Sequence, residues 1–405
     1  MADDNHRNDG GKRALSTSLI HHPYQPPAGF SAPQVGVHKA STVIFANTAA
    51  MRARNWKEKV GYTYGLHGTP TTFTLEERVA TLEGGRQCLL LPSGLAAIAL
   101  VDMALLQTGD EVLIPDNAYN PNKELARHEL SGWGIAHRFY DPMNPSSLAD
   151  AMTPATRLVW LEAPGSVTME FPDLPLLLQT ARSCGAIVAL DNTWGAGVAF
   201  NPFELGPGGG VDISMQALTK YPSGGGDVLM GSVTTRDESL HLRLKMTHMR
   251  MGWGVGANDA EALLHALPTL PLRYAAQDAA GRALARWWAA RPEIVQVLHP
   301  AIDGSPGHAL WRQSCSAAAG LFSVVFNERF TSAQVDAFVD ALALFKIGYS
   351  WAGPVSLVVP YSLAMMRPRP AWKGTLVRFS IGFEEVGDLI ADCEKALQAL
   401  TRGTR

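Results

Sequence analysis

Five features of the sequence place chemically active residue types where predicted strands end or predicted helices begin. The stretch Pro92–Leu95 lies between an apolar run and a helical run, in a turn whose free backbone N–H groups could hold a phosphate. Tyr119 follows another apolar run, where an aromatic ring could stack on a flat ligand. Asp191 directly ends a buried run, Lys220 follows one, and Arg378 lies inside one. These features combine a turn for an anion, a ring, a carboxylate, an amine and a guanidinium.

Each feature also has an ordinary structural explanation. A glycine turn can serve geometry alone, a tyrosine can pack, and an aspartate can cap a helix. A lysine can be a surface charge, and an arginine among apolar residues can form a structural ion pair. Taken together, however, the five match the phosphate, ring, pyridinium nitrogen and aldehyde of one cofactor, with the arginine left for an amino-acid carboxylate. The sequence therefore predicts a site for pyridoxal 5'-phosphate.

The elements that must position these residues alternate between strands and helices. Short runs that are apolar on both faces are predicted as strands at 88–91, 111–114, 158–161, 187–190, 213–218 and 228–233. Such strands are typical of a mostly parallel sheet with helices on both faces, which binds ligands beyond the carboxyl ends of its strands. We therefore expect an α/β fold whose site lies at that edge.

Three regions are predicted along the 405 residues. Residues 1–68 form an N-terminal arm, residues 69–267 the cofactor-binding domain, and residues 268–405 a smaller C-terminal α+β domain. Capping-box spacing predicts one helix from Thr74, with Glu77 as its partner, and another from Thr331, with Gln334.

Composition excludes several classes of partner and site. The net charge is −3 and there is no basic block, so we expect no nucleic-acid partner. No apolar run approaches the roughly 20 residues that span a bilayer, so we expect no membrane insertion. The four cysteines form no C-x-x-C pair and the histidines no H-E-x-x-H pattern, so neither a disulfide framework nor a metal site is predicted. The expected location is the cytoplasm.

The chain resembles the Cys/Met-metabolism family of pyridoxal-phosphate enzymes over nearly its whole length. The matching stretches are YGLHGTPT (64–71), LEGG (82–85), PSGLAA (92–97), DNAYNP (116–121), LEAPGSVTME (161–170), DNTWGAG (191–197), QALTKY (216–221), YSW (349–351) and GTLVRFSIGFEE (374–385). Three of these stretches look like the beta-lyase branch of the family. The resemblance implies an aspartate-aminotransferase-like (fold type I) fold, a homotetramer whose active sites borrow residues from the neighbouring subunit, and β-elimination of L-cystathionine to homocysteine, pyruvate and ammonia.

The resemblance also implies a role for each matching residue. The catalytic residues would be Lys220, as the Schiff-base lysine, with Tyr119 stacked on the ring and Asp191 at its nitrogen. Contacts to the phosphate would come from Gly94, Leu95 and Thr219, and Tyr64 would reach the cofactor and substrate of a neighbouring subunit. Substrate would be bound by Arg378 at its α-carboxylate, with Ser350 and Trp351 lining the pocket.

Three departures from the family pattern leave alternatives open. Leu66 stands where the family has an arginine that reaches a neighbour's phosphate, and Ala217 stands where a phosphate-binding serine is frequent. The segment after Trp351 reads Ala-Gly-Pro-Val in place of the usual Gly-Gly-aromatic-Glu. A broader cysteine-conjugate lyase or cysteine desulfhydrase, a γ-elimination enzyme, and a catalytically silent scaffold protein therefore remain alternatives.

Overall fold

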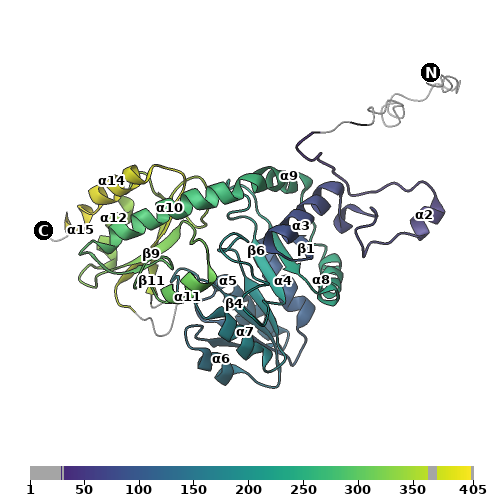
Figure 1. The fold of residues 1–405 in the computed structure, drawn as a ribbon, viewed down its shortest axis with the longest axis horizontal. Coiled ribbons are helices and arrows are strands. Elements are labelled where there is room, and N and C mark those ends of the chain that lie inside the picture. The colour runs from purple at the N-terminus through teal and green to yellow at the C-terminus, as the bar shows by residue number, and fades with distance from the viewer. Residues whose placement is uncertain (1–28, 30–31, 364–371, 403–405) are drawn as a thin grey trace. The chain divides into compact units, whose positions relative to one another are not determined.

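The computed structural model describes residues 29, 32–363 and 372–402 (Figure 1). The chain divides into two compact units between Val35 and Gly36, and the account below concerns the second unit. Most of residues 1–35 of the predicted arm lie outside the described residues.

The larger sheet has seven strands in the order β1-β7-β6-β5-β4-β2-β3. Its strands are β1 (Gln87–Leu91), β2 (Glu111–Pro115), β3 (Ala136–Tyr140), β4 (Thr156–Glu162), β5 (Ile187–Asp191), β6 (Ile213–Ala217) and β7 (Gly231–Thr235). Strands β3, β2, β4, β5 and β6 pair in parallel, and β7 runs antiparallel between β6 and β1. The predicted mostly parallel central sheet is therefore confirmed.

Helices cover both faces of this sheet, as the doubly apolar strands require. Val112 and Ile114 of β2 join one hydrophobic core, and Leu113 between them joins the other. The first core is closed by α4 (Gly94–Leu105) and α8 (Glu238–Met251), the second by α6 (Pro145–Ala151) and α7 (Leu174–Arg182). Both ends of each strand are thus fixed between two apolar layers.

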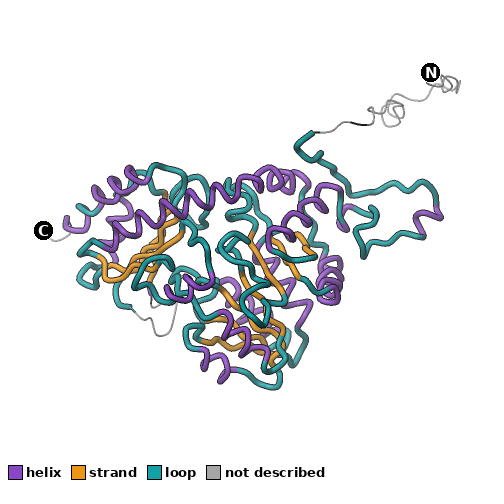
Figure 2. The backbone as a smooth tube through the Cα atoms, viewed as in Figure 1, coloured by secondary structure: helices purple, strands orange, loops and turns teal. Residues whose placement is uncertain are grey.

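A second sheet of five strands follows in the order β10-β11-β12-β9-β8. Its strands are β8 (Ile294–Leu298), β9 (Leu321–Phe326), β10 (Lys346–Ile347), β11 (Leu357–Ser362) and β12 (Thr375–Ser380), and Figure 2 shows the two sheets apart, in orange. Long helix α10 (Leu270–Ala289) supplies Trp288 to an aromatic core with Phe338 and Phe379. A smaller α+β region with its own core is therefore present.

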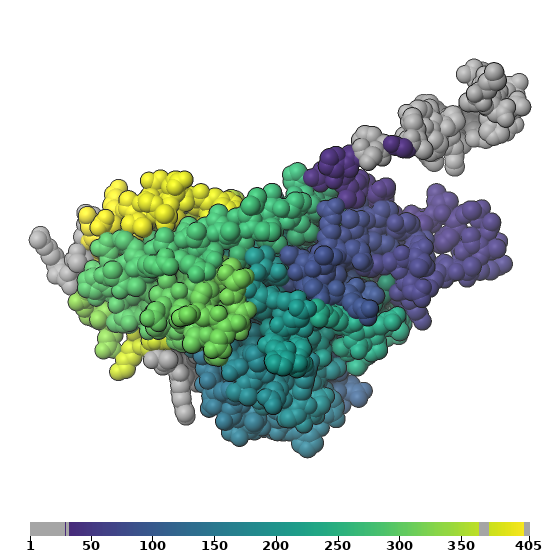
Figure 3. All heavy atoms as spheres, viewed as in Figure 1, coloured from purple at the N-terminus to yellow at the C-terminus, as the bar shows by residue number. Residues whose placement is uncertain are grey.

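The remaining helices connect or flank the two sheets. They are α2 (Thr48–Arg52), η1 (Gly65–His67), α3 (Pro70–Glu83), α5 (Asn120–Leu125), η2 (Ala126–Leu130), α9 (Ala257–Ala266), η3 (Leu267–Thr269), α11 (His308–Ser314), α12 (Ser332–Asp340), α14 (Val386–Ala396) and α15 (Ala399–Arg402). The two regions pack directly on each other: the rings of Tyr221 and Tyr274 lie 4.5 Å apart, and the Tyr221 hydroxyl accepts a hydrogen bond from the Gly320 amide (Figure 3). The domain boundaries at residues 68 and 267 remain a prediction.

One helix start differs from the prediction. Helix α3 begins at Pro70, not at Thr74, because Thr69 is the N-cap and forms a capping box with Thr72, and Pro70 suits the first helical position. The Thr74 hydroxyl instead donates to the Pro70 carbonyl inside the first turn. The second predicted capping box, Thr331 with Gln334, is confirmed at the start of α12.

Among the described residues, no helix is both long enough and apolar enough to cross a lipid bilayer. The cysteines are free thiols. No cluster of His, Cys, Asp or Glu side chains suited to holding a metal ion occurs in residues 32–363 or 372–402.

Candidate active site

The carboxyl ends of β4, β5 and β6 and the strand β12 bring most of the predicted residues together. Asp191 is the last residue of β5 and is paired in register with Glu162, the last residue of β4. Lys220 follows the end of β6 in a short turn. Arg378 approaches from β12 of the second sheet. The site therefore lies where the two sheets meet.

Lys220 is the centre of this arrangement. Its Nζ donates to the Ser350 Oγ at 2.6 Å and lies 5.5 Å from the centre of the Trp351 ring. Burial lowers the pKa of the Lys220 amine to about 8, the nearby charge of Arg378 lowers it further, and Asp191 opposes both effects. A large fraction of this amine is therefore neutral near physiological pH, as a nucleophile or base must be.

Asp191 is 9% exposed and is held by its neighbours. Its Oδ1 accepts from the Thr193 amide at 3.0 Å, and the Thr193 hydroxyl accepts from the Ala217 amide at 2.9 Å, which ties the ends of β5 and β6 together. Burial raises the pKa of the Asp191 carboxyl, and the positive charge of Lys220 partly offsets this. No cationic side chain in the described part of the chain forms an ion pair with Asp191.

Tyr119 stands beside Asp191 and is anchored by a residue that the sequence reasoning did not single out. The Tyr119 backbone amide donates to the Glu162 Oε2 at 2.8 Å. Burial raises the pKa of Glu162 well above its usual value, and the neighbouring Asp191 carboxylate adds to this rise. Burial and both carboxylates also raise the pKa of the Tyr119 phenol. Glu162 directly follows the predicted strand 158–161, so its position could have identified it.

The turn before α4 has the features of an anion cradle. Ser93 is the N-cap, and its hydroxyl accepts from the Ala96 amide at 3.1 Å, which leaves the earlier amides of Gly94 and Leu95 at the helix start. A Cβ on Gly94 would lie 2.7 Å from the Ala217 Cβ, so only glycine fits here. The Thr219 hydroxyl, in contrast, already exchanges hydrogen bonds with the Met230 backbone.

Arg378 is 7% exposed and has no carboxylate partner among the described residues. One guanidinium nitrogen donates to the Ser350 carbonyl at 3.2 Å, and the group lies 5.5 Å from the centre of the Tyr361 ring. Burial lowers the pKa of Arg378, although the group stays charged. A buried guanidinium without an acidic partner is suited to binding an anionic group that comes from outside the chain.

The segment that carries Ser350 and Trp351 has an unusual backbone. Ser350 and Ala352 have φ angles of 84° and 68°, in the region that favours glycine. The Trp351 ring packs edge-on against Tyr221 at 5.5 Å. The side chains of these two wall residues are thus turned toward Lys220 from both sides of a strained turn.

Tyr64 is the predicted site residue that is not brought to the others within the chain. It forms an isolated bridge with Thr42, its ring lies 5.9 Å from that of His67, and it is 47% exposed. Its neighbours Leu66 and His67 line a separate cavity.

The residues present suit pyridoxal phosphate. Asp191 is a buried carboxylate without a cationic side chain among its described neighbours, as a protonated ring nitrogen requires. Gly94 keeps the helix start open to within contact of Ala217, where a phosphate can approach the backbone. Lys220 presents an amine with a lowered pKa. The arrangement can bind the cofactor, and Arg378 can bind the carboxylate of an amino acid beside it.

Comparisons with known proteins agree with this reading of the site. The family model described as Cys/Met metabolism PLP-dependent enzyme matches residues 16–398. The cystathionine beta-lyase of Bordetella avium is 37% identical over 398 residues, covering 96% of this chain and 98% of the relative. The L-methionine gamma-lyase of Pseudomonas putida is 31% identical and covers 95% of this chain and 97% of the relative.

A solved structure agrees as well. The cystathionine gamma synthase of Xanthomonas oryzae, in complex with aminoacrylate and cysteine, has 28% identity and a TM-score of 0.84, covering 92% of this chain and 95% of that one. The expected fold is therefore confirmed, and so is the cofactor. The chain belongs to the family of Cys/Met-metabolism enzymes that depend on pyridoxal 5'-phosphate.

Proposed function

We propose that the chain catalyses the β-elimination of L-cystathionine to homocysteine, pyruvate and ammonia. The observation that carries the proposal is the position of Lys220, whose buried amine lies beside Arg378 and is hydrogen-bonded to Ser350 at 2.6 Å. A proton-transferring amine is thus placed next to a group that can hold an amino acid by its carboxylate. The cystathionine beta-lyase at 37% identity supports this choice of reaction.

The residues at the sheet edge would hold the cofactor. Lys220 would bind it covalently, Asp191 would pair with its ring nitrogen and Tyr119 would cover its ring. The cradle residues Gly94 and Leu95, with Thr219, would bind its phosphate. When bound, pyridoxal phosphate supplies an electron sink that stabilises negative charge at the substrate α-carbon.

The chain's own residues then orient the substrate and move its protons. Arg378 binds the α-carboxylate, and Ser350 with Trp351 lines the side-chain pocket. The freed, neutral amine of Lys220 takes the α-proton. The same amine, now protonated, gives a proton to the departing sulfur, with the Tyr119 hydroxyl assisting. Homocysteine leaves as a thiol, and hydrolysis of the remaining three-carbon unit gives pyruvate and ammonia.

The identity of the keto acid tests the reaction. We expect the holoenzyme to release pyruvate and homocysteine from L-cystathionine. Release of 2-oxobutanoate with cysteine would replace the proposal by γ-elimination, which the methionine gamma-lyase relative and the altered segment after Trp351 keep as the second candidate. Absence of any keto acid would overturn both, and cysteine and its conjugates would be tested next.

A substitution at Lys220 tests the role of the amine. Lys220→Ala should fold, as judged by circular dichroism, and should lose at least about 10³-fold in kcat, the scale of general acid–base catalysis. Borohydride should lock the cofactor to the wild-type chain but not to this variant. Lys346→Ala, at an exposed lysine that contacts only a backbone carbonyl among described residues, is the matched control and should retain full activity. Retained activity in Lys220→Ala would contradict the assignment.

The proposal includes a cytoplasmic homotetramer in which Tyr64 of the partner subunit completes each site. Large apolar side chains around the site are exposed in the single chain, including Leu229 at 70% and Tyr349 at 80%. Such exposure beside a site is typical of a surface that a second subunit covers. The free thiols agree with a reducing compartment.

A further inference from the structure

Helix α8 buries a basic face. His241, Lys245 and His248 are spaced at i, i+4 and i+7, on one side of the helix, and are exposed by 7%, 6% and 9% respectively. Leu244 is the apolar residue buried with them. Amphipathic helices normally bury apolar residues on this side, so three basic side chains there call for a specific explanation.

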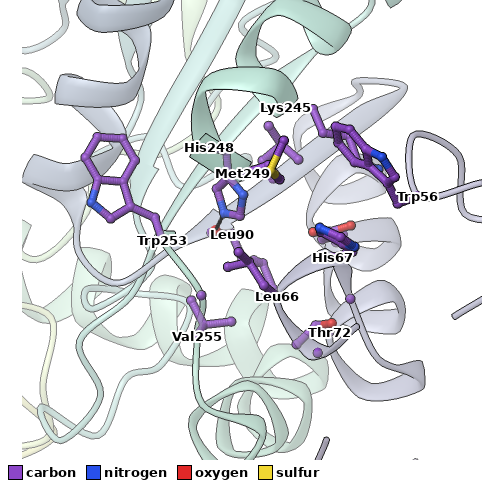
Figure 4. Close-up of a pocket in the computed structure, with 15 residues that line it drawn as sticks. Trp56, Leu66, His67, Thr72, Leu90, Lys245, His248, Met249, Trp253 and Val255 are labelled. Carbon is purple, nitrogen blue, oxygen red and sulfur yellow. Dashed lines mark hydrogen bonds between the residues drawn. The ribbon is translucent and has the colours of Figure 1, made fainter. Parts of the chain in front are cut away.

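A cavity lies against this face (Figure 4). It is enclosed by α8, α3, β1 and the η1 turn, and its volume is about 30 Å³. Its side-chain lining includes Lys245, His248, His67, Trp56, Thr72 and Glu76. None of the described contacts of Lys220 or Arg378 involves a residue of this cavity, which is therefore separate from the candidate active site.

The Lys245 ammonium group has no partner among the described residues. It forms no hydrogen bond there, and no carboxylate lies within ion-pair distance. Glu76, the acidic residue of the lining, binds Lys59 at 2.9 Å, and Lys59 also takes Glu77 at 2.6 Å. The carboxylates of this region are thus already engaged. A buried ammonium left without a counter-charge is costly, and it is stabilised when an anion binds beside it.

The other groups that face the cavity do not supply this anion. His67 pairs with the Thr63 hydroxyl at 2.9 Å and stacks on Trp56 at 5.1 Å, and His248 pairs with the Leu90 carbonyl at 2.9 Å. Burial lowers the pKa of these two imidazoles and lowers that of His241 to about 4. Near pH 7 the charges at the cavity are therefore those of Lys245, Lys59 and Glu76, two positive and one negative.

We propose that this cavity is a binding site for a small anion, with the Lys245 ammonium as its direct partner. The volume of about 30 Å³ admits a halide ion or the head of a carboxylate and is too small for a nucleotide or a sugar phosphate. The Thr72 hydroxyl and the imidazoles at the wall are further polar groups for such a ligand. The site is independent of the proposed lyase activity.

Bromide locates the site directly. Crystals of the holoenzyme would be soaked in sodium bromide and measured at the bromine absorption edge. We expect an anomalous peak within about 3.5 Å of the Lys245 Nζ, and no peak there in Lys245→Met, whose side chain has similar length and no charge. No peak in the wild type, or an equal peak in Lys245→Met, would overturn the proposal.

Thermal unfolding of the holoenzyme gives an independent measurement in solution. Chloride should raise the wild-type Tm by about 1–3 °C more than that of Lys245→Met at the same ionic strength, because a ligand that binds only the folded state stabilises it. Arg250→Met, which removes an exposed cation from the same helix, controls for general screening and should follow the wild type.

Sodium acetate in place of chloride distinguishes the two sources of the anion. An equal shift with acetate identifies a carboxylate-accepting site, and a shift with chloride alone identifies an inorganic-anion site. Equal salt responses of the wild type and Lys245→Met in both salts would contradict the proposal. If Lys245→Met fails to fold, the bromide experiment on the wild type still decides.

Discussion

At the scale of single residues, the amine of Lys220 is set by its surroundings. Because its pKa is lowered to about 8, the amine is neutral above that pH and charged below it. In the cofactor-free protein we expect labelling of Lys220 by an acylating reagent, followed by peptide mass spectrometry, to reach half its maximum near pH 8. Arg378→Met removes a nearby positive charge, so it should move that midpoint upward and raise KM roughly 10- to 100-fold. Arg250→Met should change neither, and an unmoved midpoint in Arg378→Met would contradict the proposed electrostatics.

The same scale shows how far residue types alone predict the site. Asp191, Lys220 and Arg378 could be proposed because each is a charged residue at or inside an otherwise apolar run, an arrangement that requires a partner. Glu162 was missed because its contact is with a backbone amide 43 residues away, which spacing does not reveal. The engagement of Thr219 with Met230 and the cavity position of Lys245 likewise depend on tertiary packing.

At the scale of elements, the strained segment 349–356 is held by hydrogen bonds from its surroundings. The Ser356 amide and hydroxyl donate to the two Glu384 carboxylate oxygens at 2.8 and 2.7 Å. Ser356→Ala should lower the free energy of unfolding by about 1–3 kcal/mol, because it leaves a carboxylate oxygen unsatisfied, and should raise KM, because the segment carries Ser350. Urea denaturation and steady-state kinetics measure both effects. Ser239→Ala, at an exposed serine, should stay within about 0.5 kcal/mol of the wild type, and an equal result for both variants would contradict this role.

The elements themselves were largely predictable. Apolar runs identified the buried strands because both faces of the larger sheet are covered. The start of α3 was placed four residues late, since Thr74 and Glu77 have the spacing of a capping box but Thr69 and Pro70 have the geometry of the actual helix start. The positive φ angles of Ser350 and Ala352 left no mark in the sequence, because neither residue is glycine.

At the scale of the whole molecule, shared sites predict complementation between two defective chains. If Tyr64 acts in a neighbouring site, Tyr64→Ala and Lys220→Ala homo-oligomers should each be nearly inactive. Co-refolding them in equal amounts should restore activity to about a quarter of wild type, since half of the randomly formed dimers are mixed and each mixed dimer has one intact site. Cofactor absorbance and turnover per chain measure this. No recovery, with mixed oligomers verified by mass spectrometry, would show that Tyr64 and Lys220 act within one chain.

The pairing of β1 with β7 has a consequence for synthesis of the chain. Strand β1 and the glycine turn that follows it emerge early from the ribosome, but their only sheet neighbour in the described fold, β7, begins at Gly231. Until then β1 has an unpaired edge with apolar residues on both faces, the kind of surface that aggregates or recruits chaperones. The strand that leads into the anion cradle therefore joins the sheet last, so a nascent chain arrested before Gly231 would be expected to lack a competent cofactor site.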